Sequence, residues 1–360
     1  MTSRPPSQPS PRGGRSKKTC SHTRQAGAAL LAAMLTVTLV ATFAAAALWQ
    51  QWRATEVETA ERARIQAAWI LVGALDWSRL ILREDSLARA GDGTDNLTEP
   101  WSVPLAEARL STFLAAQRGV AQVPDASTDT ADAFLSGQIS DQQALLNLRN
   151  LIQNGQPDAT AQRQFARLFQ YLNLPAQELD ALTQQLRLAL ADAPQNNAPL
   201  LPQSLAQLTW WGLPESSVQR LAPYATLLPA RTPVNLNTAG AVVLWASAPQ
   251  LSMAQAQQLV DAREARHFGS EADAIRVLGG SGAAGNVGNG GITSATHAVS
   301  SQYFEVRGRL RLEGATVQER SLIHKLRGEA RTLWRERGAL PADAAALGSA
   351  PYNAAPDRAP

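Results

Sequence analysis

The sequence is poor in the residues that carry covalent and metal chemistry. One cysteine, Cys20, and four histidines occur among 360 residues. A single cysteine cannot form a disulfide within the chain or supply a metal-binding pair. The histidines His22, His267, His297 and His324 lie in unrelated contexts, and the motifs Gly-x-Ser-x-Gly and His-Glu-x-x-His are absent. The sequence gives no catalytic residue and no cofactor-binding motif, and we expect the protein not to be an enzyme.

Charged residues are missing from a long stretch near the N-terminus. Residues 25–52 contain none, whereas a helix that crosses a bilayer needs only about 20 apolar residues. Five basic residues and no acidic residue lie between Arg12 and Arg24, so the positive-inside rule places the N-terminus in the cytoplasm. We predict a transmembrane helix over residues 28–52, with the rest of the chain beyond the membrane.

The position of one glycine bears on how the N-terminus is processed. Gly27 precedes the apolar run, whereas an ordinary secretory signal is cut after a shorter apolar region. This arrangement resembles the leaders that prepilin peptidase removes, with Gly27 before the cut and Ala28 as the mature N-terminus. A plain signal anchor is the alternative. The leader, residues 1–27, holds six basic residues and no acid, so its removal turns the net charge of +3 into −3 and removes the charge argument for nucleic-acid binding.

Helical periodicity continues beyond the apolar run. Ile65, Trp69, Val72 and Leu75 recur at helical spacing. We expect one long helix whose second half packs through this face against a globular head, the first half of which spans residues 53–150. A linker helix in solvent is the alternative, but it would be polar on all sides.

Acidic residues gather after this helix. Loops of this kind can hold calcium, because Ca²⁺ takes six to eight oxygen ligands. The spacing does not match the twelve-residue helix-loop-helix calcium loop, and a solvated acidic loop is the alternative. The candidate ligands are Asp85, Asp92, Asp95 and Glu99, with Asp125, Asp129 and Asp132 as a competing cluster.

Residues 151–295 contain several short apolar stripes at helical spacing, separated by proline and glycine turns. They predict an inserted helical domain. Within it, Val234-Asn235-Leu236-Asn237-Thr238-Ala239 and the two segments that follow resemble a helix-hairpin-helix or SAM-like unit. Many such units bind DNA through glycine amides in the turn, but Gln250 and Ser252 occupy those places here. A membrane-anchored DNA-binding protein is therefore only the alternative function, and we expect no nucleic acid.

The end of the chain predicts a return to the head. Residues 303–312 alternate apolar and charged side chains, and residues 316–326 form the returning strand of a hairpin. This hairpin lies in a second half of the head, residues 296–328. Gly280 to Gly285 matches a dinucleotide fingerprint by letters, but poor helix formers follow, which favours a linker. Residues 329–360 predict a disordered tail. The expected fold class is α+β, with a helix packed on a small antiparallel sheet.

Three segments, together with the leader and residues 97–101, carry a resemblance to a known family. The segments are Ile139-Ser140-Asp141, Asn147-Leu148-Arg149-Asn150-Leu151 and Val234-Asn235-Leu236-Asn237-Thr238-Ala239. Over residues 27–328 the chain resembles the K-type minor pseudopilin of type II secretion systems, general secretion pathway protein K. That family also lacks the glutamate that most pilin-like subunits carry at the fifth mature position, which is Ala32 here.

The resemblance implies a function, partners and modifications. It implies a structural subunit that caps the pseudopilus tip, initiates assembly with the I-type, J-type and H-type minor pseudopilins, and supports export of folded proteins across the outer membrane. It also implies cleavage by prepilin peptidase, methylation of the new N-terminus, and one pass through the bacterial inner membrane with the bulk of the chain in the periplasm. Finally, it implies structural calcium in the head, which strengthens the expectation for Asp85, Asp92, Asp95 and Glu99.

Overall fold

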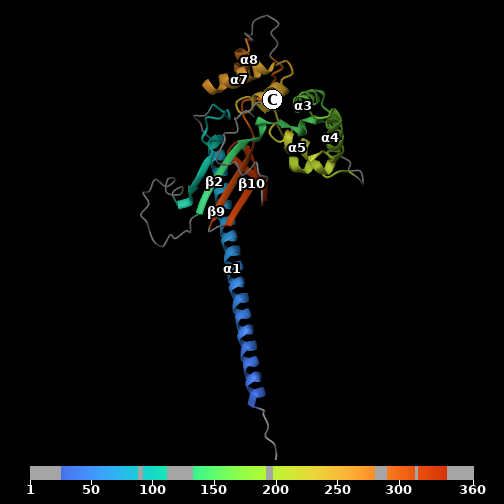
Figure 1. Ribbon diagram of the computed structural model, residues 1–360. Helices are drawn as coiled ribbons and strands as arrows, with labels where there is room; N and C mark the ends of the chain where they lie inside the picture. The colour runs from blue at the N-terminus through green and yellow to red at the C-terminus, as the bar shows by residue number, and fades with distance from the viewer. Residues whose placement is uncertain are drawn as a thin grey trace, which may run out of the picture. The chain divides into compact units, whose positions relative to one another are not determined.

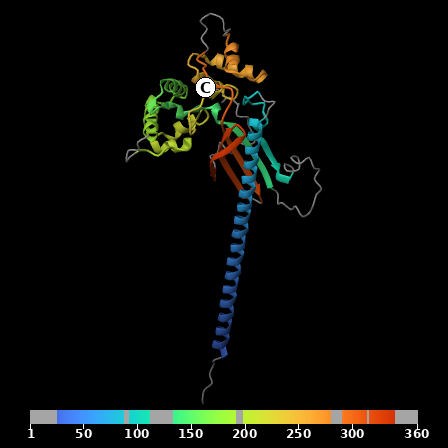
Figure 2. The same cartoon turned by 180° about the vertical axis from the view of Figure 1, so that it is seen from behind.

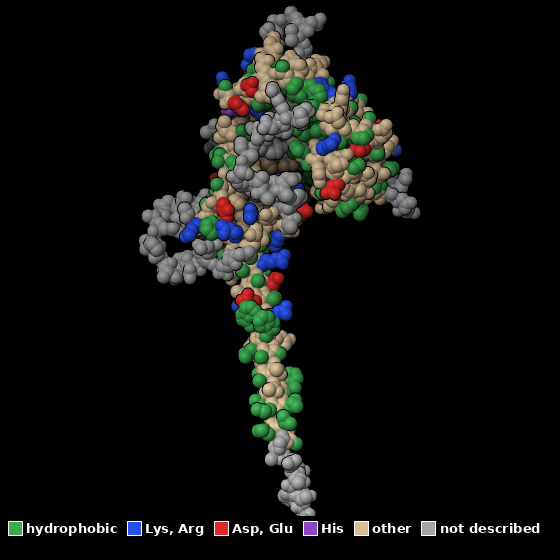
Figure 3. Space-filling view, viewed as in Figure 1, with side chains coloured by type: hydrophobic (Ala, Val, Ile, Leu, Met, Phe, Trp, Pro, Cys, Tyr) green, Lys and Arg blue, Asp and Glu red, His purple; other side chains and the backbone are tan. Residues whose placement is uncertain are grey.

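The computed structural model describes residues 26–87, 92–111, 133–191, 198–279, 290–312 and 315–338. The chain consists of two parts, residues 1–61 and residues 62–360. Helix α1, Ala26–Leu87, runs through both. All side chains described between residues 28 and 61 are exposed, and Figure 3 shows hydrophobic side chains along this segment. The helix is long and apolar enough to cross a membrane, as the sequence predicts.

A five-stranded antiparallel sheet forms the head, in the order β1-β2-β9-β10-β11 (Figure 1). The strands are β1 Leu105–Arg109, β2 Ala133–Asp141, β9 Tyr303–Leu312, β10 Ala315–Leu326 and β11 Glu329–Arg337. The predicted hairpin is confirmed, because β9 and β10 pair from Leu312 opposite Ala315 to Tyr303 opposite His324. Strand β2 precedes the inserted helices and pairs with β9 beyond them, so the sheet joins two distant parts of the chain.

The second half of α1 packs on one face of this sheet (Figure 2). Its buried stripe consists of Ala67, Leu71, Leu75 and Leu82. The predicted packing face was wrong in part, because Leu75 is buried but Trp69 is 73% exposed. Two sets of apolar residues recur at helical spacing in this part of α1, so the spacing alone does not show which set faces the sheet. The stripe of Ala67, Leu71, Leu75 and Leu82 is the one that faces the sheet.

The sequence prediction of a disordered tail from residue 329 was also wrong. Residues 329–337 form β11, whose Arg337 donates to Glu319 Oε2 on β10 at 2.7 Å. Glu319 is fully buried, and a buried carboxylate is costly unless it is paired. The ion pair between Arg337 and Glu319 therefore helps to hold β11 in the sheet. Residues 339–360 lie outside the described residues.

The inserted domain lies between β2 and β9 and is mainly helical. Phe165, Leu168, Phe169 and Leu182 are among the buried residues of its own apolar core. Its helices are α3 Ala159–Tyr171, α4 Ala176–Ala189, α5 Glu215–Leu221, α6 Ala241–Ser247, α7 Met253–Ala265 and α8 Glu271–Val277. The observed fold thus confirms the predicted α+β class, while the assignment of α6 and α7 to a helix-hairpin-helix unit stays a prediction.

Short elements connect the sheet to these helices. Strands β3 Leu146–Asn147 and β6 Ala225–Thr226 pair in parallel, as do β7 Val234–Asn235 and β8 His297–Ala298. The strands β4 Ile152–Gln153 and β5 Gln156–Pro157 are antiparallel. The 3₁₀ helices are η1 Pro100–Ser102, η2 Gln142–Ala144, η3 Leu148–Leu151 and η4 Leu205–Trp211.

Candidate functional site

Three of the four predicted calcium ligands converge at the end of α1. Asp85 lies in the last turn of that helix, Asp95 and Glu99 lie in the loop before η1, and one oxygen from each falls within 4.8 Å of the others. Asp92 does not join them, because its carboxylate contacts His267 Nε2 at 2.5 Å and accepts from the Thr94 hydroxyl at 2.7 Å. The competing residues Asp125, Asp129 and Asp132 lie outside the described residues.

A cation that sequence reasoning missed lies among these carboxylates. Lys325 of β10 places its Nζ 2.7 Å from Asp85 Oδ2 and also donates to Asp95 Oδ1. The residue is only 9% exposed. Asp85 and Lys325 are 240 positions apart, so no local pattern joins them. The available signal was the alternation of β10, in which Lys325 follows Ile323 on the side that faces α1.

Burial and the neighbouring charges set the ionisation of this cluster. Burial raises the pKa of Asp95 to about 6, although Lys325 opposes the shift. Burial also raises the pKa of Glu99 to about 8, against the hydrogen bond from Trp101 Nε1. For Lys325, burial lowers the pKa but the attraction of Asp95 and Asp85 outweighs it, so the net shift is upward. The hydrogen bond from the Thr94 side chain lowers the pKa of Asp92 to about 2.

The cluster continues into a buried network that joins the head to the inserted domain. Ser301 N donates to Asp95 Oδ2 at 2.7 Å, and Asn235 Nδ2 donates to the Asp95 carbonyl oxygen at 3.0 Å. On the other side, Asp141 Oδ2 accepts from Thr238 Oγ1 at 2.6 Å and from Ser301 Oγ at 2.6 Å. All five residues are buried. Each polar group is thus paired where solvent cannot reach it, which gives the junction one preferred geometry.

A second set of asparagines forms hydrogen bonds within the inserted region. Asn147 Nδ2 donates to the Ala230 carbonyl oxygen at 2.7 Å, and Asn150 exchanges two hydrogen bonds with the main chain of Thr232. Asn147 Oδ1 also accepts from Leu228 N at 3.2 Å. Asn147 and Asn150 therefore hold two parts of the inserted region together, whereas Asp141, at the end of β2, is the residue of the resemblance that joins the insert to the sheet.

Two polar side chains of the predicted helix-hairpin-helix segment, Arg263 and Asn237, are buried. Arg263 of α7 is 5% exposed, and its Nη1 donates to the carbonyl oxygens of Leu236 and Ala239. Asn237 Nδ2 donates to the Phe268 carbonyl oxygen at 2.9 Å. At the turn, Ser252 caps α7 by accepting from Gln255 N. These groups serve the local fold.

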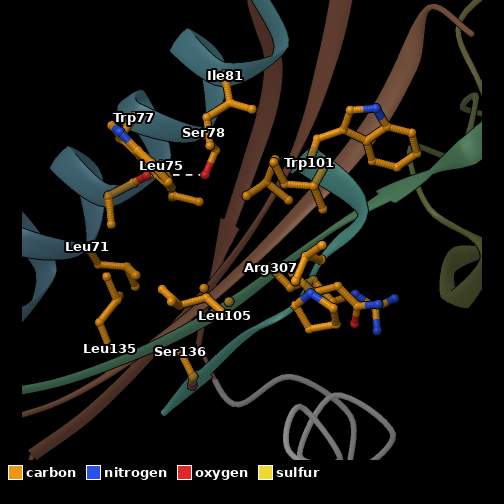
Figure 4. Close-up of a pocket in the computed structure, with 18 of the residues that line it drawn as sticks. Leu71, Leu75, Trp77, Ser78, Ile81, Trp101, Leu105, Leu135, Ser136 and Arg307 are labelled. Carbon is orange, nitrogen blue, oxygen red and sulfur yellow. Dashed lines mark hydrogen bonds between the residues drawn. The ribbon is translucent and has the colours of Figure 1, made fainter. Parts of the chain in front are cut away.

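A cavity of about 230 Å³ lies between α1, η1 and the sheet (Figure 4). Gly137 and Gly308 face each other across β2 and β9, and both line this space. The remaining lining is mostly apolar, with Leu71, Leu75 and Trp101 among its residues. Arg307 is the one titratable side chain among the lining residues that the structure describes. The polar side chains of its lining are those of Ser78, Ser136, Gln138 and Arg307, together with the indole groups of Trp77 and Trp101.

Comparison with known proteins assigns this architecture. Two family models, both described as type II secretion system protein K, match residues 144–230 and 234–293. The type II secretion system protein K of Pseudomonas aeruginosa is 27% identical over 308 residues, which covers 78% of this chain and 83% of that protein. In these matched regions the chain is similar to the type II secretion system protein K family.

A solved structure shares the fold of this chain. A chain in the crystal structure of the GspK-GspI-GspJ complex from the type 2 secretion system of enterotoxigenic Escherichia coli is similar, with a TM-score of 0.58 and 19% identity. The likeness covers 78% of this chain and 98% of that chain. The two family models lie in the inserted domain and contain Asn147, Asn150, Asn235 and Asn237, so the matched regions include four of the asparagines that organise it.

The processing residues predicted for a protein K lie at the start of α1. Gly27 and Ala28 belong to that helix, which begins at Ala26. Residues 1–25 of the predicted leader lie outside the described residues. Cleavage between Gly27 and Ala28 therefore stays a prediction.

Proposed function

We propose that this minor pseudopilin caps the tip of the type II secretion pseudopilus and initiates its assembly with I-type, J-type and H-type minor pseudopilins. In this role it supports export of folded proteins across the outer membrane and performs no catalysis. Prepilin peptidase cuts after Gly27, the new N-terminus is methylated, and α1 anchors the chain in the bacterial inner membrane with the bulk of the chain in the periplasm. Support comes from the similarity to type II secretion system protein K and from the surface of α1.

The observation that carries this proposal is an apolar stripe on the outer face of α1. Ile65, Trp69 and Leu80 are 55%, 73% and 44% exposed. They lie on the side of the helix opposite Ala67 and Leu71, which pack on the sheet. Exposed apolar stripes of this kind mark interaction surfaces. The stripe suits the N-terminal helix of a neighbouring I-type or J-type pseudopilin, since helices associate by packing such stripes together.

A glycine within this stripe supports the same occupant. Gly73 lies one turn after Trp69 on the exposed side of α1. A Cβ added there would meet nothing within 4 Å, so packing within the chain gives no reason for glycine. A glycine inside a helix costs about 1 kcal/mol relative to alanine. A close approach by a partner helix would account for it.

The residue at the fifth mature position supports a place at the tip. In most pilin-like subunits a glutamate there is thought to compensate the charged N-terminus of a neighbouring subunit inside the membrane, where an unpaired charge is costly. Ala32 cannot do this. The chain is therefore suited to form a complex in few copies and not to stack upon itself.

The test is co-purification of the full chain with I-type and J-type pseudopilins from detergent-solubilised membranes. Trp69→Ala should lower the yield of the complex severalfold, because it removes the largest exposed side chain of the stripe. Trp210→Ala is the matched control, since Trp210 is 64% exposed in the inserted domain. Equal losses in both variants, or no loss in either, would refute the assigned surface.

A further inference from the structure

The carboxylate cluster of this chain offers calcium few free oxygens. Asp95 Oδ1 accepts from Lys325 Nζ and Asp95 Oδ2 accepts from Ser301 N. Glu99 Oε1 accepts from Asn96 Nδ2 at 2.9 Å, and Glu99 Oε2 accepts from Trp101 Nε1. Asp85 Oδ2 accepts from Lys325 Nζ. Calcium needs six to eight oxygen ligands, so Asp85, Asp95 and Glu99 in this arrangement do not fit the ion.

The cation in this space is part of the chain itself. The Lys325 ammonium bridges the last turn of α1, through Asp85, and the following loop, through Asp95. It also lies 5.0 Å from the centre of the Phe304 ring, whose face attracts a cation. Three contacts of favourable sign thus surround a side chain that is almost wholly removed from water.

The composition of the chain sets Lys325 apart. Its other lysines are Lys17 and Lys18, both in the predicted leader, so after residue 18 every other basic side chain among Lys and Arg is arginine. The two types differ in shape, since an ammonium is a compact charge with three donors and a guanidinium is a planar fork. A compact charge suits the space between two carboxylates that approach from different elements, as a metal ion would.

We propose that Lys325 is a built-in substitute for a divalent cation among Asp85, Asp95 and Glu99, so that its contacts with Asp85 and Asp95 hold α1, the loop and β10 together without calcium. The ammonium supplies the positive charge that offsets the repulsion between the carboxylates. Because it is covalently attached to β10, this junction does not depend on the free calcium concentration. The inference concerns these three carboxylates and is independent of the proposed position at the pseudopilus tip.

Terbium, a luminescent probe for calcium sites, tests this directly on the full chain in detergent micelles. Trp101 donates to Glu99 and would therefore sensitise any terbium ion bound there. In the wild-type chain no terbium should bind beside Glu99. Replacing Trp101 by Phe should therefore lower the luminescence only by the small share that Trp101 contributes to the background signal. In Lys325→Gln the ammonium is gone and the carboxylates are free, so luminescence should rise severalfold. Adding Trp101→Phe or Asp85→Asn to Lys325→Gln should remove the rise.

Lys325→Arg is the matched control, because it keeps the charge and changes the shape. It should acquire no terbium signal. Calcium should raise the melting temperature of Lys325→Gln by several degrees. If calcium shifts the melting temperature of the wild-type chain at all, that shift should stay the same when Glu99→Gln is introduced. The proposal is overturned if wild-type luminescence falls sharply with Trp101→Phe, or if Glu99→Gln abolishes a wild-type calcium response. These two wild-type arms decide the matter even if Lys325→Gln does not fold.

Discussion

Asn235 Nδ2 donates a hydrogen bond of 3.0 Å to Asp141 Oδ2, which lies 94 positions earlier in the chain. Asp141 ends strand β2 of the head, and Asn235 belongs to β7 of the inserted region. Both side chains are buried. Burial raises the pKa of Asp141, while hydrogen bonds from Ser301, Thr238 and Asn235 act in the opposite direction. The contact therefore links the stability of the two regions.

Asn235→Ala should destabilise the full chain by about 1–3 kcal/mol, because it removes donors from buried acceptors. Thermal unfolding in detergent, followed by tryptophan fluorescence, measures the effect. Gln250→Ala is the control, since Gln250 is exposed in the turn before α7, and it should change stability little. If both variants melt like the wild type, the junction does not carry the energy assigned to it.

His297 predicts a pH dependence of stability. It is fully buried, with Nε2 2.9 Å from Ser247 Oγ and Nδ1 2.8 Å from Thr296 Oγ1. Burial lowers its pKa from 6.5 to about 4. Between these values the unfolded chain binds a proton that the folded chain does not. The free energy of unfolding should therefore fall as pH drops from 6.5 towards 4, by up to roughly 3 kcal/mol from this residue.

The melting temperatures of the wild type and of His297→Gln should be measured between about pH 7.5 and about pH 4.5. This range covers most of the interval between the pKa of His297 in the unfolded chain and its pKa in the folded chain. The carboxylates titrate alike in both proteins, so the difference between the two curves isolates the histidine. The difference should shrink as pH falls. A difference that stays constant over the whole range would show that His297 does not titrate differently in the two states.

Gly73→Ala should act in opposite directions on folding and on assembly. The isolated chain should gain up to about 1 kcal/mol of stability, because alanine favours the helix and meets no neighbour. Complex formation with I-type and J-type pseudopilins should weaken, because the added methyl group holds a partner helix away. Melting curves and co-purification from the same preparations measure both effects. An assembly yield equal to that of the wild type would leave Gly73 without a role at the surface.

Gly27→Leu should block processing, because the peptidase site requires a residue without a side chain before the cut. Intact mass spectrometry of the membrane-extracted protein should then show the precursor, while the wild type begins at Ala28. Gly13→Leu serves as the control within the leader and should be processed normally. A Gly27→Leu chain that still begins at Ala28 would mean that the leader has been assigned wrongly.

Local patterns predicted those parts of the structure that depend on neighbouring residues. The continuous apolar run gave α1, and the alternation of residues 303–312 gave β9 with its hairpin partner. Such patterns report burial along one element and cannot show what packs against it. That is why the stripe of Trp69 was predicted to pack in place of the stripe of Ala67, and why β11 was predicted to belong to a disordered tail.

In the candidate site, too, the sequence predicted the residues that lie close together along the chain and missed the distant one. Asp85, Asp95 and Glu99 are close in sequence and converge in space. Asp92 belongs to the same acidic loop but pairs with His267, 175 positions away. The partner of the cluster, Lys325, comes from a distant strand. Proximity in sequence predicted the acids, whereas only the sheet topology brings in the cation that neutralises them.

The proposed function depends most on which protein contacts the exposed face of α1. Photo-crosslinking from position 69 of the full chain, in membranes that also contain I-type and J-type pseudopilins, tests it most directly. A photoreactive residue in place of Trp69 should crosslink to one of these two subunits, and the same residue in place of Trp210 should not. Crosslinks from position 69 to a second copy of this chain, or none to either subunit, would contradict the proposal that an I-type or J-type pseudopilin packs on this face of α1.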